Sequence, residues 1–190
     1  MLILASKSPR RQQLLKKIVD QFRVLPADID EELVRGMTSE RAKETSKMKA
    51  YKIAAQHPHD TILAVDTIVV FNHEIFGKPR DNDEAKSMLT RLSGQRHLVI
   101  SGYTIMENER EINRSTVTEV FFNELTPATI DAYVASGSPL DKAGAYGIQD
   151  EDFHLVKKIV GSYDNVMGLP TEDLRKYLTS NGTLRTNFSQ

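Results

Sequence analysis

An aspartate interrupts an otherwise apolar stretch of this chain of 190 residues. Asp66 stands between Ile62–Val65 and Ile68–Phe71, two apolar runs that together predict one buried strand. A buried carboxylate is costly unless it is paired, hydrogen-bonded or bound to a metal ion. Asp66 is therefore either a functional acid or base, or an aspartate at a strand end or bulge that bonds nearby backbone N–H groups.

A group of polar residues near the N-terminus could bind phosphate. Ser8 and Pro9 are typical of the N-cap and first residue of a helix, where a bound anion is favoured. Arg10 and Arg11 follow, and their guanidinium groups suit phosphate oxygens. The same pattern is also typical of an ordinary helix start with solvated arginines. The residues alone leave both interpretations open.

Lysines could add further positive charge. Lys49 shares a predicted helical face with Ala42 and Ile53, so its ammonium either extends to solvent or points into a cleft. Lys78 lies in the sequence Gly-Lys-Pro, which is either a close-fitting ligand loop or a simple exposed turn. If these lysines and the two arginines converge, they could neutralise the negative charge of bound phosphate groups.

Acidic residues could hold a divalent metal ion. The turn Asp28–Glu32 is rich in carboxylates, which could join Asp66 in binding Mg²⁺ or Mn²⁺. A solvated acidic loop is the alternative. His57 and His59 lack a third ligand, so we do not assign them to a metal site.

The segment Lys142–Gln149 contains small residues and glycines that favour a close-fitting loop over a core strand. Gln149 offers both a hydrogen-bond donor and an acceptor, which suits the edge of a pyrimidine base. A flexible connection is the alternative interpretation of this segment.

Strand and helix signals alternate along the chain and must position these residues. Strands are predicted at Leu2–Ala5, Phe22–Leu25, Thr61–Phe71, His97–Met106, Arg114–Phe122 and Phe153–Val160, and helices from Pro9, over Thr38–Gln56 and Asn82–Leu92, from Thr126 to near Gly137, and from near Pro170 to Asn181. This order predicts an α/β fold with a mixed, curved sheet flanked by helices, as two lobes around a central cleft. Residues 1–182 are expected to form this domain, and residues 183–190 a flexible tail.

Composition excludes several other classes of protein. The formal net charge of −1 provides no basic field for nucleic acid or an anionic membrane, and no apolar run is long enough to span a bilayer. A cysteine count of 0 excludes disulfides and thiolate chemistry, which agrees with a cytoplasmic location.

Several motifs, taken in order, resemble those of the Maf family of nucleoside triphosphate pyrophosphatases. They are the stretch Leu2–Leu15, Lys49-Ala50, Asp66-Thr67, Lys78-Pro79, the string Lys-Ala-Gly-Ala-Tyr-Gly-Ile-Gln ending at Gln149, and Asn165–Pro170. The resemblance implies a Maf/ITPase-like fold and a homodimer. The chain departs from the family pattern at Val65, where alanine is usual, and at Asp150, where glycine is usual.

The resemblance also implies roles for individual residues. Asp66 would be the general base, and it would hold a divalent cation together with Glu31, or with Glu32 if the alignment shifts by one residue. Phosphate contacts would come from Ser8, Arg10, Arg11, Lys49 and Lys78, and the specificity positions of the branch acting on dTTP and UTP would correspond to Arg10, Thr67 and Gln149. Asn165–Pro170 would be a tight turn into the last helix.

The activity implied by this resemblance is hydrolysis of dTTP and UTP, and of modified pyrimidine nucleotides, to the monophosphate and pyrophosphate. One alternative is a nucleotide-sensing binding protein linked to inhibition of septum formation. Another is a pyrophosphatase for purine or modified purine nucleotides. Nucleic acid and membranes are not expected as partners.

Overall fold

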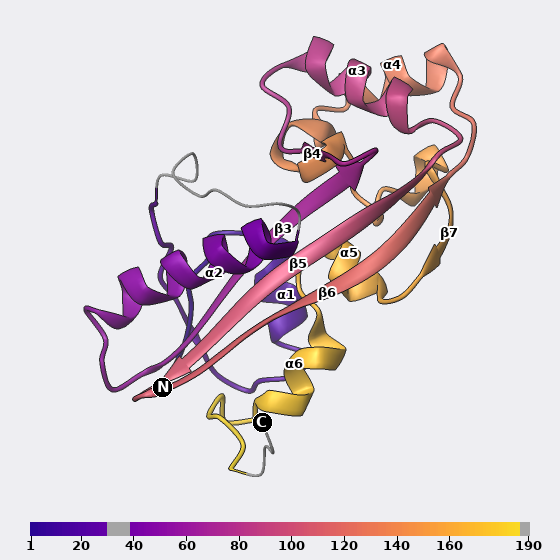
Figure 1. Cartoon of the computed structure of the whole chain (residues 1–190). Coiled ribbons are helices and arrows are strands. Elements are labelled where there is room, and N and C mark those ends of the chain that lie inside the picture. The colour runs from indigo at the N-terminus through magenta and orange to yellow at the C-terminus, as the bar shows by residue number, and fades with distance from the viewer. Residues whose placement is uncertain (30–38, 187–190) are drawn as a thin grey trace. The chain divides into compact units, whose positions relative to one another are not determined.

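The computed structural model describes residues 1–29 and 39–186 (Figure 1). Its elements are, in order, β1 (Leu2–Leu4), α1 (Pro9–Leu15), β2 (Arg23–Val24), α2 (Ser39–Ala54), β3 (Thr61–Phe71), β4 (Glu74–Phe76), α3 (Asn82–Leu92), β5 (Arg96–Glu107), β6 (Arg110–Phe122), α4 (Pro127–Ala135), the 3₁₀ turns η2 (Ser138–Asp141), η3 (Ala143–Ala145) and η4 (Glu151–Phe153), β7 (Val156–Val160), α5 (Tyr163–Met167) and α6 (Thr171–Tyr177). The predicted alternation of strands and helices is confirmed.

The described strands form one mixed seven-stranded sheet in the order β2-β1-β3-β5-β6-β7, with β4 paired to β3. Strand β1 runs parallel to β2 and to β3, with Leu2 opposite Thr61. Strand β4 turns back antiparallel to β3, with Ile75 opposite Val70, and β7 is antiparallel to β6. The predicted mixed sheet flanked by helices is thus confirmed.

The chain forms two compact units. The first contains Met1–Asp66, Ser101–Thr116 and Gly168–Gln190, and the second contains Thr67–Ile100 and Val117–Met167. Strands β3, β5 and β6 run through both, so Asp66 and Thr67 are consecutive residues that belong to different units. This division agrees with the predicted two lobes.

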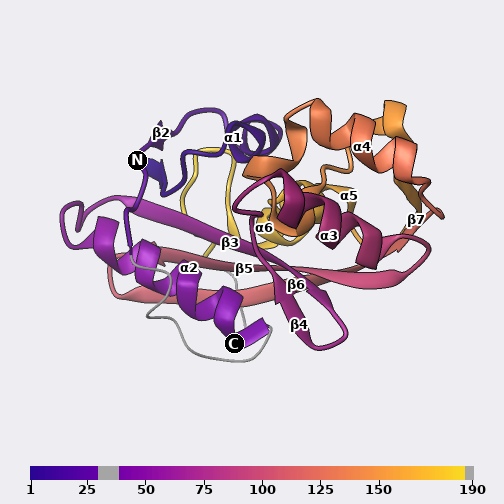
Figure 2. The same ribbon diagram turned by 90° about the horizontal axis from the view of Figure 1, so that it is seen from above.

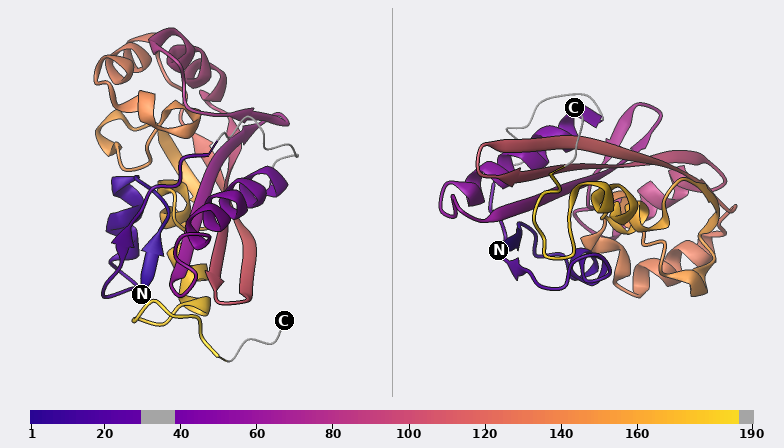
Figure 3. Two further views of the ribbon diagram at one scale, coloured as in Figure 1. Left: turned by 90° about the vertical axis from the view of Figure 1, so that its left-hand side faces the viewer. Right: turned by 90° about the horizontal axis from the view of Figure 1, so that it is seen from below.

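In the first unit, helices lie on both faces of the strands. Helices α1 and α2 are on opposite faces of this part of the sheet (Figures 2 and 3). The α2 face buries Ile3 of β1 with Ala50 and Ile53 of the helix. The helix crosses β5 at Gly102, where an added Cβ would lie 2.2 Å from the backbone carbon of Ala42. Glycine is therefore required for this close approach.

In the second unit, α3 packs beside α4, and both begin at side-chain caps. The hydroxyl of Thr126 accepts a hydrogen bond from the N–H of Thr129 at 3.1 Å, and Pro127 follows it as predicted. The core of this unit is rich in aromatic residues. Within it, His97 and Tyr146 are buried and share a hydrogen bond of 2.7 Å.

Two segments in the second unit differ from the prediction. Strand β7 begins at Val156 and not at Phe153, because η4 precedes it and His154 has a φ of 48°, which breaks the extended backbone. The short helix α5 was not predicted. Its five residues include Asn165, which was assigned to a turn.

The end of one other predicted segment also needs correction. Helix α6 begins at Thr171 and ends at Tyr177, earlier than predicted. Within the segment predicted as a tail, Leu184 is buried and pairs with Leu178 in an antiparallel bridge. Its N–H also donates to the carboxylate of Glu107 at 3.1 Å. The predicted start of the second helix at Thr38 lies outside the described residues.

Candidate functional site

Arg11 connects the N-terminal segment to a part of the first unit that is distant in the sequence but adjacent in space. Ser8 caps α1 as predicted, since its Oγ accepts the N–H of Arg11 at 3.4 Å. The Nε of Arg11 donates to the carbonyl oxygen of Gly168 at 2.9 Å, and Nη1 donates to Ser6 Oγ at 3.2 Å. These bonds hold the guanidinium in one place. Arg10 is half-buried in the same first turn of α1.

Asp66 and Lys49 form the central charged pair of the first unit. The Nζ of Lys49 lies 3.0 Å from Oδ1 of Asp66, and their side chains are 11% and 14% exposed. Lys49 thus points inward from α2 and does not extend to solvent. Asp66 lies in the middle of β3 and not at a strand end, so the ion pair, rather than a strand-end cap, offsets the cost of this carboxylate.

Of the predicted metal ligands, Asp66 lies within the described residues. Glu31 and Glu32 lie outside the described residues. Within the described ranges, no group of three or more His, Cys, Asp or Glu side chains could hold a metal ion. Asp66 is one carboxylate of the kind that Mg²⁺ binds, since Mg²⁺ is usually held through one or two carboxylates together with phosphate oxygens and waters. Its ion pair to Lys49 engages Oδ1.

The remaining predicted residues belong to the second unit. Thr67 is half-buried in β3, and Lys78 is exposed between β4 and α3. Gln149 follows η3, and its Oε1 is buried with no hydrogen-bond partner among the described residues. Its amide packs against Gly147, where an added Cβ would lie 2.6 Å from Nε2. Oε1 of Gln149 is therefore a hydrogen-bond acceptor that has no partner among the described residues.

Sequence reasoning missed the residues that hold the Gln149 segment. The hydroxyl of Tyr133 donates to Oδ2 of Asp150 at 2.6 Å and accepts the N–H of Gly147 at 2.9 Å. The hydroxyl of Ser138 also donates to Asp150 Oδ2 at 2.6 Å. Tyr133 and Ser138 lie on α4 and η2, and nothing in the sequence spacing connects them to Gln149.

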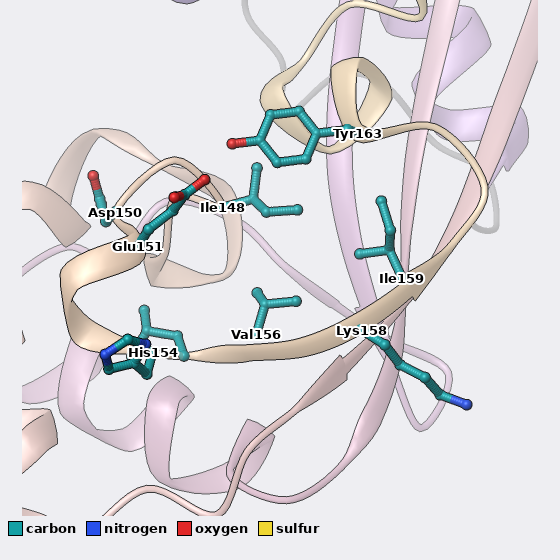
Figure 4. A pocket seen from close by; sticks show the side chains of 10 residues that line it. Ile148, Asp150, Glu151, His154, Val156, Lys158, Ile159 and Tyr163 are labelled. Atoms are coloured by element: carbon teal, nitrogen blue, oxygen red, sulfur yellow. The ribbon is translucent and has the colours of Figure 1, made fainter.

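A pocket of about 280 Å³ is lined by residues next to Gln149 in the chain and by strand β7 (Figure 4). The side chains of Ile148, Val156 and Ile159 converge on it, while the ammonium of Lys158 points away. Gln149 is not among its lining residues. The pocket therefore does not coincide with the predicted site, and we assign no function to it.

The family of this chain follows from comparison with known proteins. The family model described as Maf-like protein matches residues 1–181, and the chain belongs to this family. It is 46% identical over 177 residues to a protein of Carboxydothermus hydrogenoformans named dTTP/UTP pyrophosphatase, covering 92% of this chain and 95% of that one. The resemblance found in the sequence is confirmed.

Other relatives carry the same name. A protein of Pyrococcus furiosus named dTTP/UTP pyrophosphatase is 42% identical, covering 89% of each chain. One of Aquifex aeolicus is 37% identical, covering 98% of each. Among solved structures, the Staphylococcus aureus Ham1 protein aligns with a TM-score of 0.46 and 14% identity, over 81% of this chain and 90% of that chain. No helix within the described part of the chain has the length and apolar character needed to cross a membrane.

Proposed function

We propose that this protein hydrolyses dTTP and UTP, and modified pyrimidine nucleotides, to the nucleoside monophosphate and pyrophosphate. The observation that carries the chemistry is the ion pair of 3.0 Å between Lys49 and Asp66, which holds a carboxylate in an otherwise apolar strand. The substrate class is supported by the relatives of 37% to 46% identity that are named dTTP/UTP pyrophosphatase.

In the proposed reaction, Asp66 orients a water molecule and accepts its proton as the water oxygen attacks the α-phosphorus. The new P–O bond forms as the bond between the α-phosphorus and the bridging oxygen breaks, and pyrophosphate leaves with that oxygen. Lys49 holds the Asp66 carboxylate at 3.0 Å. An ammonium has three donors, so this bond is compatible with a phosphate contact by the same lysine.

The negative charge of the triphosphate would be met by the cationic side chains predicted from the sequence, with Ser8 adding a polar contact. These residues are Ser8, Arg10, Arg11, Lys49 and Lys78. Fixed cations also stabilise charge that develops on a pyrophosphate leaving group. The guanidinium of Arg11 is already held by Gly168 and Ser6, which favours such preorganisation.

The base would be recognised by Gln149, with Thr67 and Arg10 as the other specificity positions. The buried Oε1 of Gln149 can accept the imide N–H of thymine or uracil, while its Nε2 can donate to a carbonyl oxygen of the base. A hypoxanthine ring also presents an N–H beside a carbonyl. Inosine triphosphate is therefore the informative purine competitor, and purine hydrolysis is the second candidate activity.

A divalent cation, Mg²⁺ or Mn²⁺, completes the proposal, with Asp66 and Glu31 as its protein ligands. When bound, it would neutralise phosphate charge and stabilise the leaving group. We also propose that the protein works in the cytoplasm as a homodimer, following the family resemblance and the nature of the substrate. Light scattering after gel filtration measures the mass of the assembly.

The deciding experiment measures pyrophosphate release from dTTP, UTP, ITP and 7-methyl-GTP with Mg²⁺ or Mn²⁺, using the wild type and Asp66→Asn. Preferential release from dTTP and UTP, lost in Asp66→Asn, supports the proposal. Preferential release from a purine triphosphate keeps the chemistry and rejects the pyrimidine assignment. Binding of dTTP without turnover in the wild type would favour the nucleotide sensor.

A further inference from the structure

One buried phenol holds both ends of the turn that carries Gln149. The turn is closed by a hydrogen bond of 3.1 Å from the N–H of Asp150 to the carbonyl oxygen of Gly147. At its first residue, Gly147 donates its N–H to the hydroxyl of Tyr133 at 2.9 Å. At its last residue, Asp150 accepts the proton of the same hydroxyl at 2.6 Å. Tyr133 is 0% exposed, so its ring cannot move without disturbing the core.

The carboxylate of Asp150 has a second, partly buried hydrogen-bond partner. Its Oδ2 also accepts the hydroxyl proton of Ser138 at 2.6 Å. Ser138 in turn accepts hydrogen bonds from the ammonium of Lys142, at 3.0 Å through Oγ and at 2.6 Å through its carbonyl oxygen. Lys142 is buried, and its ammonium also forms an ion pair of 2.8 Å with Asp141. Burial and the bond to Asp150 raise the pKa of Tyr133, which therefore stays a donor at neutral pH.

Gln149, whose Oε1 has no hydrogen-bond partner among the described residues, lies between the two residues that bond to Tyr133. Gln149 lies between Gly147 and Asp150, and its amide is packed so tightly that any side chain at 147 would collide with it. Because both flanking residues are tied to Tyr133, the backbone direction of Gln149 is fixed. A fixed backbone and a packed amide restrict the orientations open to Oε1, and a preorganised acceptor discriminates best between donors of different position.

We propose that Asp150 is a positioning residue for base selectivity, acting through Tyr133 and Ser138 to orient the Gln149 amide toward a pyrimidine imide. The inference rests on the proposed function, since Gln149 is taken as the base contact. Asp150 touches neither phosphate nor reacting atoms in this account. Its loss therefore affects the choice of base and leaves the chemical step in place.

The test compares Asp150→Ala and Tyr133→Phe with Asp152→Ala, which removes an exposed acid on the 3₁₀ turn η4 that follows Asp150. Steady-state pyrophosphate release is measured for dTTP and for ITP. For Asp150→Ala and for Tyr133→Phe we expect KM for dTTP to rise about tenfold, with kcat within about threefold of wild type. The ratio of kcat/KM for dTTP over ITP should fall by about the same factor. Asp152→Ala should behave as wild type.

Asp150→Asn and a double variant separate positioning from folding. Asp150→Asn keeps one carbonyl acceptor for the hydroxyls and should restore part of the selectivity. If Asp150 and Tyr133 act through one link, the double variant Asp150→Ala/Tyr133→Phe should lose little more selectivity than either single variant. Thermal unfolding of each variant shows whether the fold is kept. A drop in stability with an unchanged ratio of dTTP to ITP would mean that the network is structural and that the inference is wrong.

Failure of the proposed function gives a different result. If the wild type hydrolyses none of the triphosphates, calorimetric binding of dTTP and ITP decides the inference. Loss of the dTTP preference in Asp150→Ala would then still support it. The inference would be overturned if the wild type and Asp150→Ala preferred dTTP over ITP equally, or if the wild type bound no nucleotide.

Discussion

The ammonium of Lys49, on α2, lies 3.0 Å from Oδ1 of Asp66 in the middle of β3, and both side chains are largely buried. The two residues are 17 positions apart and come from a helix and from the strand that follows it. The pair places the Asp66 carboxylate within a largely apolar strand, beside the ammonium of Lys49.

Replacing Asp66 by Asn should abolish turnover while leaving nucleotide binding. A positioned general base contributes about 10²- to 10⁴-fold to the rate, and an amide cannot accept the proton of water. Pyrophosphate release measures the loss, and calorimetry with dTTP measures binding. Asp20→Asn, at an exposed position of the same unit, is the control. Near-normal turnover of Asp66→Asn would remove Asp66 from the mechanism.

Lys49→Met should destabilise the fold because it leaves the Asp66 carboxylate unpaired. Breaking a buried ion pair costs about 3 kcal/mol in the free energy of unfolding. The matched control is Lys86→Met, whose partner Asp131 is 2.7 Å away but whose side chains are 45% and 62% exposed, so the expected loss is below about 1 kcal/mol. Urea unfolding measures both. Equal losses in the two variants would contradict the structural importance of the buried pair.

Acidification should destabilise the protein through His97. Burial lowers the pKa of His97 from 6.5 to about 4, so the unfolded chain binds the proton first. Stability that is present above pH 6.5 is then lost as the pH falls toward 4, by up to about 3 kcal/mol. The free energy of unfolding is measured across this range for the wild type and for His97→Gln. The difference in the free energy of unfolding between the wild type and His97→Gln should change with pH. A difference that stays constant would show that His97 does not titrate in this way.

Two glycine-to-alanine variants should have contrasting effects. At Gly147 a Cβ would lie 2.6 Å from Nε2 of Gln149, a side-chain atom that can move, so the preference for dTTP over ITP should fall. At Gly102 the Cβ would lie 2.2 Å from the backbone of Ala42, so the fold should lose about 3 kcal/mol without a change in base preference. Selectivity assays and urea unfolding measure the two effects. The reverse pattern would contradict the assignment of Gln149 to the base.

Removal of divalent cations should stop the reaction. With EDTA in excess, pyrophosphate release from dTTP is expected to cease, because the charge of the triphosphate is then only partly neutralised by the protein. Addition of Mg²⁺ in excess over EDTA should restore it. Full activity in EDTA would exclude Asp66 as a metal ligand in the mechanism.

Much of the fold was accessible from local patterns. The starts of α1 and α4 follow from Ser8-Pro9 and Thr126-Pro127, because a cap acts on the N–H groups of the next three residues. Helix α3 was predicted with the bounds that the structure has. The late start of β7 was missed because the φ of 48° at His154 is a property of its surroundings and not of histidine.

The sequence by itself determined the family, the identities of the candidate residues and the burial of the strand around Asp66, because motifs and hydrophobic periodicity are local properties of the chain. The tertiary structure decided which side chains meet. It paired Lys49 with Asp66, tied Arg11 to the carbonyl oxygen of Gly168 and linked Tyr133 to Asp150. Such contacts depend on how separate helices and strands pack together, and no spacing along the chain specifies them.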